Sequence, residues 1–104
     1  MITRLVKLSI RPESASGFET IFYNTQALIE GFEGCQKTNL FKVAGAESQY
    51  FTISYWNSEE SLENYRASEL FKNVWSTVKP LFSAKAEAWT LNGVIPQDSI
   101  QLPA

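Results

Sequence analysis

The chain has 104 residues, of which 44% are hydrophobic and 19% are charged, and its formal net charge is −2. This balance is typical of one globular domain and differs from that of a disordered protein. A charge this small, without a basic stripe, argues against binding to nucleic acid or to anionic membranes.

The sequence contains no histidine and one cysteine, Cys35. An internal disulfide framework is therefore excluded, and we expect Cys35 to be buried and inert because it lacks a histidine to activate it. No apolar run approaches the ~20 residues that span a bilayer, and the N-terminus does not resemble a signal peptide. A cytoplasmic protein is the expectation.

The first segment with strand character covers residues 2–10, where alternate positions are apolar and Arg4 interrupts the apolar face near its edge. Pro12 ends this strand. A helix should follow, with Ser16 and Glu19 forming a capping box at its start. Its apolar stripe consists, at helical spacing, of Phe18, Ile21, Phe22, Thr25, Leu28 and Ile29.

Two further strands are predicted at residues 35–42 and 50–56, and the turn sequence AGAES between them indicates a hairpin. Asn57, with Glu60 three positions later, is expected to form a second capping box. Two short helices come next, one carrying Leu62 and Tyr65 and the other carrying Phe71, Val74, Trp75 and Val78.

Pro80 should end the second of these helices, and residues 84–91 are predicted to form the last strand. Strand, helix, strand, strand, helix pair and strand make a βαββαβ order, which indicates an α+β ferredoxin-like fold. Its antiparallel sheet carries helices on one face. We expect a single domain over residues 1–104, with a core at about 2–91 and an extended tail at 92–104.

The third strand has apolar residues on both faces, with Phe51, Ile53 and Tyr55 opposite to Tyr50 and Trp56. Helices cover only one face, and soluble monomers rarely leave a large apolar patch in water. A homodimer that packs sheet against sheet is therefore predicted. The alternative is a tail that folds back over its own sheet through Val94, Ile95, Ile100 and Leu102.

From about Ile2 to Leu91 the chain resembles the antibiotic biosynthesis monooxygenase (ABM) domain of the dimeric α+β barrel superfamily. The sharpest likeness lies in YFTISYWNSEESLENYRASELF, and GFEGC matches the usual entry into the second strand. The residues at the family's positions are Trp56, Ser58, Glu59, Glu60, Leu62, Ser68 and Phe71, with Gly31, Phe32, Glu33 and Gly34 in the second motif.

The sequence also departs from the family, whose members commonly carry histidine where Tyr65 and Leu70 stand. The haem-degrading branch is similar through FKNVW, but its axial histidine falls at Trp75 and its cleft asparagine at Val6. An indole nitrogen is only a donor and cannot ligate iron. The resemblance therefore does not imply haem degradation.

Trp56 and Tyr65 are the candidate catalytic residues. By resemblance, Trp56 lies at the mouth of a cleft, where it would stack on an aromatic substrate and donate its N–H to a developing oxyanion. Tyr65 would act as a proton donor or, with its pKa lowered, as a base. For both residues the alternative is an ordinary packing role, and Arg66 is expected to point away from its neighbour Tyr65.

The substrate pocket is expected to include Arg4, which would bind an acidic or phenolate group or else extend its head group into water. The other expected pocket residues are Val6, Ser54, Phe71 and Trp75. No residues for a metal or a cofactor are expected, because the sequence has neither a metal-ligand set nor a dinucleotide fingerprint.

The resemblance implies a cofactor-independent monooxygenase that oxidises a quinol-like or polyphenolic substrate with molecular oxygen. Two alternatives belong to other classes: a non-catalytic dimer that binds a small hydrophobic ligand, and a structural dimer whose cleft is packed shut. The sequence does not decide between an enzyme and these proteins, nor does it identify the substrate, the general base, the pathway or the role of the tail.

Overall fold

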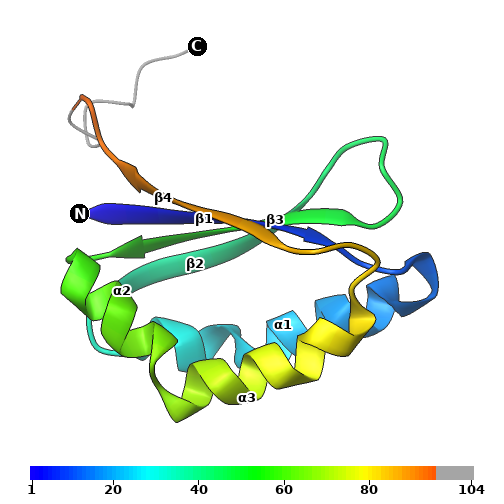
Figure 1. Ribbon diagram of the computed structural model, residues 1–104, viewed down its shortest axis with the longest axis horizontal. Coiled ribbons are helices and arrows are strands. Elements are labelled where there is room, and N and C mark those ends of the chain that lie inside the picture. Colours follow the sequence, from blue (N-terminus) through cyan, green and yellow to red (C-terminus); the bar gives the residue numbers. More distant parts are fainter. Residues whose placement is uncertain (96–104) are drawn as a thin grey trace.

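The computed structural model describes residues 1–95, which form a four-stranded antiparallel sheet with all helices on one side (Figure 1). In chain order the elements are β1 (Ile2–Ser9), η1 (Pro12–Ser14), α1 (Ala15–Glu30), β2 (Cys35–Lys42), β3 (Gln49–Trp56), α2 (Glu59–Arg66), α3 (Glu69–Val78), η2 (Lys79–Leu81) and β4 (Glu87–Asn92). The strand order is β2-β3-β1-β4. The predicted α+β ferredoxin-like βαββαβ fold is confirmed.

Strand β1 lies at the centre of the sheet, between β3 and β4. Its register pairs Arg4 with Ser54 and Thr90, and Val6 with Thr52 and Ala88. Because side chains alternate along a strand, cross-strand partners share a face. These residues therefore all lie on the face of the sheet that the helices cover.

The predicted capping box at the start of α1 is wrong. The short helix η1 brings the chain into helical geometry early, so Ser14 is the N-cap residue and Ser16 already lies inside the first turn. Glu19 instead accepts a hydrogen bond from the Tyr50 hydroxyl and approaches Lys42 at 3.8 Å. It joins the helix to the sheet rather than capping the helix.

The second predicted capping box is displaced by one residue. Ser58 has the extended backbone of an N-cap residue, and its Oγ accepts a hydrogen bond of 3.1 Å from the backbone N–H of Ser61. Asn57 accepts a hydrogen bond from Gln36 on β2. Ser68 caps α3 in the same way, with Phe71 as the donor at 3.1 Å.

Helix α3 ends at Val78, as Pro80 predicts, and the chain continues through η2. The last strand differs from the prediction because β4 begins at Glu87, three residues after the predicted start at position 84. Before it, Phe82 forms an isolated bridge with Ile10, which lies just beyond the end of β1. The chain around Phe82 therefore pairs with the end of β1 through this single bridge, outside the regular pairing of β4 with β1.

The side chains on the helical face form two buried clusters. One contains Leu8, Ile10, Phe18, Tyr50 and Val78, and the other contains Ile29, Trp56, Leu62 and Tyr65. Burial of such side chains contributes roughly 1.5–3 kcal/mol each and fixes the helices to the sheet. The space between the two clusters is not filled, and it forms the site described below.

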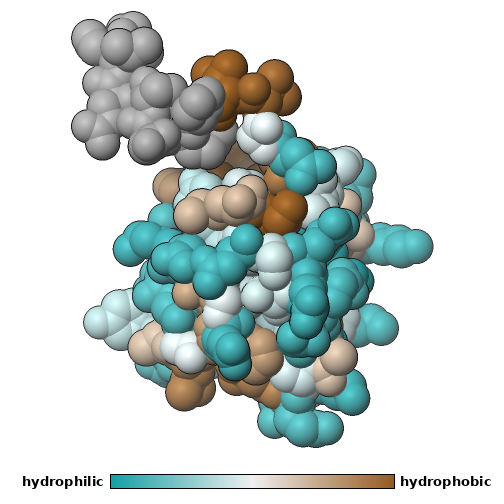
Figure 2. Space-filling view, turned by 90° about the vertical axis from the view of Figure 1, so that its left-hand side faces the viewer, coloured by the Kyte–Doolittle hydropathy of each residue, from teal (hydrophilic) through white to brown (hydrophobic). Residues whose placement is uncertain are grey.

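The opposite face of the sheet, which we call the outer face, has no helix over it in Figure 1. Its rows of cross-strand neighbours include Leu5 beside Ile53 and Trp89. Three large apolar side chains on this face are exposed: Phe41 at 50%, Trp89 at 42% and Leu91 at 42%. Figure 2 shows apolar surface where β4 leaves the sheet.

The described start of the predicted tail does not cover the outer face. Val94 is 97% exposed and Ile95 is 62% exposed. The other two residues of the fold-back alternative, Ile100 and Leu102, lie outside the described residues.

Gly34 is the described glycine with the least room for a side chain. Its φ is +89°, and a Cβ added there would lie 2.3 Å from Ser61 Oγ on α2. We therefore expect Gly34→Ala to lower the free energy of unfolding by roughly 2 kcal/mol or more, measured by urea denaturation.

Gly45→Ala is the matched control, because Gly45 has a φ of +80° but open space around it. In Gly45→Ala the free energy of unfolding should fall by only about 1 kcal/mol, the contribution of backbone strain alone. Equal losses in the two variants would show that the close approach of Gly34 to α2 contributes nothing.

Candidate functional site

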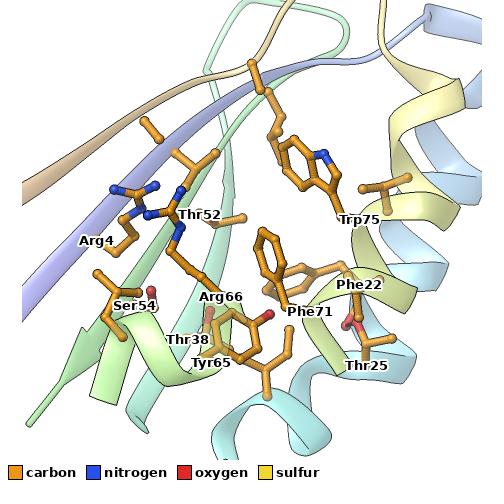
Figure 3. A pocket seen from close by; sticks show the side chains of 18 of the residues that line it. Arg4, Phe22, Thr25, Thr38, Thr52, Ser54, Tyr65, Arg66, Phe71 and Trp75 are labelled. Atoms are coloured by element: carbon orange, nitrogen blue, oxygen red, sulfur yellow. Dashed lines mark hydrogen bonds between the residues drawn. The ribbon is translucent and has the colours of Figure 1, made fainter. Parts of the chain in front are cut away.

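A cavity of about 390 Å³ lies between the sheet and the helices (Figure 3). This volume is within the roughly 300–1,000 Å³ of small-molecule sites. Most of the wall is apolar, and it comes from all four strands and all three α-helices. The lining residues are Arg4, Val6, Leu8, Phe18, Ile21, Phe22, Thr25, Ile29, Thr38, Thr52, Ser54, Trp56, Leu62, Tyr65, Arg66, Phe71, Val74, Trp75, Val78, Ala86 and Ala88.

The seven site residues that the sequence predicts all line this one cavity: Arg4, Val6, Ser54, Trp56, Tyr65, Phe71 and Trp75. They come from β1, β3, α2 and α3, so the fold gathers positions up to 71 residues apart in the chain. Their chemical roles stay predictions.

Trp56 is fully buried, and its indole N–H donates a hydrogen bond of 2.9 Å to Ser54 Oγ. Its ring stacks on Tyr65 with the centroids 4.9 Å apart. The N–H that the sequence assigned to an oxyanion is therefore already engaged. In this arrangement Trp56 offers the cavity an apolar surface and holds Ser54 in place.

Tyr65 is held by aromatic neighbours on several sides, including Phe71 at a centroid distance of 5.3 Å and Phe32 at 5.5 Å. Figure 3 shows its hydroxyl directed toward the middle of the site. Among the described residues, no hydrogen-bond partner engages this hydroxyl. A ligand in the cavity would therefore meet a phenol with a free donor and a free acceptor.

Burial raises the pKa of Tyr65 to about 12, and the nearby Cys35 adds to the increase. The prediction that a lowered pKa makes Tyr65 a base is therefore wrong. Desolvation disfavours the phenolate, and no cation within residues 1–95 counters that effect. Near neutral pH the residue is a neutral phenol that donates a hydrogen bond.

A chain of aromatic rings runs along the helical wall. Phe71 follows Tyr65, Trp75 stacks on Phe71 at 5.8 Å, and Phe82 meets the edge of Trp75 at 5.4 Å. These contacts connect the two buried clusters along one side of the cavity. Flat, rigid side chains of this kind collapse poorly into an empty space, which helps to keep the cavity open.

Arg66 lines the cavity together with Arg4, a placement that the sequence did not predict. The pKa of Arg4 is lowered, first by burial and then by repulsion from Arg66, while Glu63 acts in the opposite direction. Arg4 also donates a hydrogen bond of 2.9 Å to Thr90 on β4. Arg4 therefore lines the cavity and keeps a partly exposed head group, while its predicted binding of an acidic or phenolate group stays a prediction.

Sequence reasoning also missed three hydroxyl groups on the wall, those of Thr25, Thr38 and Thr52. The signal for Thr52 was available, because it shares the parity of Ser54 and Trp56 on β3. Thr38 becomes a neighbour of Ser54 only through the register of β2 with β3, and that register contains an irregularity between Cys35 and Lys37.

The cavity opens beside β4. Ala88 and Thr90 point to the helical side of the sheet, yet both are exposed. The helices therefore stop short of this edge strand and leave an entrance for a ligand. The two arginines lie at this entrance, since Arg4 reaches Thr90 and the side chain of Arg66 is 42% exposed.

The described wall carries no aspartate, glutamate or histidine. Within residues 1–95 no group of three or more potential metal ligands comes together. Cys35 is half-buried rather than fully buried, and burial raises the pKa of its thiol, which fits the inert role expected for it. No helix in the described part of the chain is long and apolar enough to cross a membrane.

A protein-family model described as antibiotic biosynthesis monooxygenase matches residues 1–75. No match was found among curated proteins.

Several solved structures share the fold. One described as antibiotic biosynthesis monooxygenase has a TM-score of 0.84 at 15% identity, covering 91% of this chain and 100% of that chain. Rv0793 from Mycobacterium tuberculosis has a TM-score of 0.83 at 16% identity, with coverages of 92% and 97%. A variant of SnoaB, a cofactor-independent oxygenase from Streptomyces nogalater, has a TM-score of 0.80 at 16% identity, with coverages of 92% and 95%. At these identities the likeness shows the fold.

The raised pKa of Tyr65 predicts a loss of stability in alkali. The folded state holds this proton up to a pKa of about 12, whereas an unfolded tyrosine loses it near pH 10. Below about pH 10 the stabilisation is complete, and the free energy of unfolding should fall as the pH rises from there toward about 12. Urea unfolding at a series of pH values measures this fall.

Tyr65→Phe should show a shallower fall in this pH range because it has no proton to lose. Tyr23→Phe, which changes an exposed tyrosine on α1, is the control and should keep the wild-type slope. If Tyr65→Phe also keeps the wild-type slope, the Tyr65 phenol is not desolvated.

Proposed function

The chain belongs to the antibiotic biosynthesis monooxygenase family, and from this we propose that it is a homodimeric, cofactor-independent monooxygenase that oxidises a quinol-like or polyphenolic substrate with molecular oxygen. The observation that carries the proposal is the open, aromatic-lined cavity into which the Tyr65 hydroxyl points without a protein partner. SnoaB, which shares the fold, is a cofactor-independent oxygenase.

The proposed chemistry relies on the substrate as the electron donor. Molecular oxygen is a triplet, so it reacts slowly with closed-shell molecules, but an electron-rich phenolate or carbanion transfers one electron to it. Recombination of the radical pair forms a carbon–oxygen bond. For an anthrone, one oxygen atom then remains as the new quinone carbonyl, and the other leaves as water with the two hydrogens of the oxidised carbon.

The cavity supports three requirements of this reaction. Its apolar wall excludes water from the reactive anion, the aromatic chain offers faces on which a planar ring stacks, and Tyr65 donates a hydrogen bond to the charge that forms. Arg4 and Arg66 make the entrance positive, which favours the ionised form of a bound substrate. The described wall offers no carboxylate or imidazole as a base, so we assign loss of the substrate proton to solvent water at the open entrance, where the field of the two arginines is positive.

A non-catalytic protein that binds a small hydrophobic ligand is the second candidate. It is favoured by the engaged N–H of Trp56 and by the lack of a base on the described wall. The third alternative, a structural dimer with a closed cleft, has less support because the cavity is open.

The homodimer in the proposal is supported by the outer face. Leu5, Ile53, Phe51 and Tyr55 are only partly buried there, and the larger side chains at its edges are exposed. A second copy that packs its own outer face on this one would remove both surfaces from water, in the isologous way that two-fold dimers use. Sheet-to-sheet packing leaves the cavity of each protomer on the outside of the dimer.

The oxygenase proposal is tested by incubating purified protein, treated with a metal chelator, with anthrone under air. Quinone formation and oxygen uptake should both be faster with protein, and isotopically labelled oxygen should appear in the quinone. Tyr65→Phe should lower kcat roughly a hundredfold, because a donor to developing charge is lost.

Tyr23→Phe is the matched control for the loss of a phenol and should keep the wild-type rate. Equal rates of quinone formation with and without protein, for anthrone and for a menadiol-type quinol, would leave the ligand-binding candidate as the better description.

The dimer is tested by light scattering during size-exclusion chromatography, which should give twice the monomer mass. Ile53→Lys places a charge at the centre of the outer face and should shift the protein to monomer, since a buried unpaired charge is costly. Tyr23→Lys, on the exposed side of α1, should remain dimeric. A wild-type monomer at all concentrations would refute the two-fold arrangement.

A further inference from the structure

Two arginine side chains from different elements converge at the cavity. Arg4 comes from the centre of the sheet on β1, and Arg66 comes from the last turn of α2. Figure 3 shows their guanidinium groups next to one another on the same side of the site. Both arginines line the cavity, and the pKa of Arg4 is lowered first by burial and then by repulsion from Arg66.

The charges around this pair do not balance. Arg66 forms an ion pair with Glu63 at 3.0 Å, whereas Arg4 has only the neutral hydroxyl of Thr90 as a hydrogen-bond partner among the described residues. Glu63 is 61% exposed and lies on the solvent side of α2. The entrance therefore holds two cations and one anion, beside a wall that is otherwise apolar.

Holding a partly buried guanidinium beside a second one costs free energy, because like charges repel and each group has lost some of its water. A planar guanidinium fork pairs best with a two-oxygen anion, and two forks together define a place for such a group. The interior beyond the entrance has no cations and suits an uncharged, flat body.

We propose that Arg4 and Arg66 form a carboxylate-binding subsite, and that the natural ligand is an aromatic acid whose ring enters the cavity while its carboxylate stays at the entrance. A free inorganic anion would fill the subsite but leave the apolar interior empty. The oxidisable character of the ring rests on the proposed function, whereas the preference for an acid does not.

The test is calorimetric titration with naphthoate and with its neutral amide, naphthamide, which carry the same ring and do not react with oxygen. The wild-type protein should bind naphthoate roughly tenfold to a hundredfold more tightly than naphthamide, the range expected for hydrogen bonds to a charged group. This preference should shrink as salt is raised, because the entrance is open to solvent.

Arg4→Gln and Arg66→Gln should each remove most of the preference for the acid and leave the affinity for naphthamide unchanged. Arg11→Gln is the matched control, because Arg11 pairs with Glu13 away from the cavity and should keep the full preference. Circular dichroism on every variant establishes that the fold is retained.

Equal affinities of the wild-type protein for the acid and the amide would overturn the subsite, and so would a preference that survives both arginine substitutions. Failure to bind either compound would overturn it as well. None of these measurements involves turnover, so the two proposals fail separately. A protein that prefers naphthoate but does not oxidise anthrone keeps the subsite and loses the oxygenase.

Discussion

The register of β1 is the constraint on which the rest of this structure depends. This strand lies in the middle of the sheet and pairs on both sides, so its alternation decides which residues of β3 and β4 face the helices. A shift by one residue would move Arg4, Val6 and Leu8 to the outer face and bring Leu5 and Lys7 under the helices. That shift is opposed because it would expose Leu8, which is buried in the core, and would place Lys7 under the helices. The register of β1 thus sets which side chains line the site.

The cavity exists because the helical layer is anchored at its two ends and not between them. Trp56, Leu62 and Tyr65 fasten α2 to one end of the sheet, while Leu8, Phe18 and Val78 fasten α1 and α3 toward the other. The aromatic chain from Tyr65 to Phe82 bridges the interval with rigid rings. Closing the space would require these rings to move together.

Polarity in the site is arranged by depth. The interior is apolar, with single hydroxyl groups such as that of Tyr65, while the charges lie at the entrance beside β4. Burial makes the Tyr65 phenol harder to ionise and the Arg4 guanidinium less stable as a cation, so at both residues it disfavours the charged form. An anionic substrate would stabilise the charged form of Arg4 and accept a hydrogen bond from the Tyr65 hydroxyl. The geometry thus favours an acidic aromatic ligand whether or not it is oxidised.

The sequence by itself determined the element order and the ends of most elements, because period-two and period-3.6 patterns are local. The family resemblance pointed to seven of the residues that line the cavity, and their roles stay predictions. It misplaced both capping boxes, since a cap depends on where the backbone enters helical geometry. Because η1 precedes α1, the N-cap of α1 is Ser14, two residues before Ser16, and the N-cap of α2 is Ser58, one residue after Asn57. Only the tertiary structure decided that Arg66 meets Arg4, that Trp56 donates its N–H to Ser54, and that the Tyr65 pKa rises instead of falling. Each of these depends on distances between elements and on burial, which strand register and helix packing set and residue spacing along the chain does not.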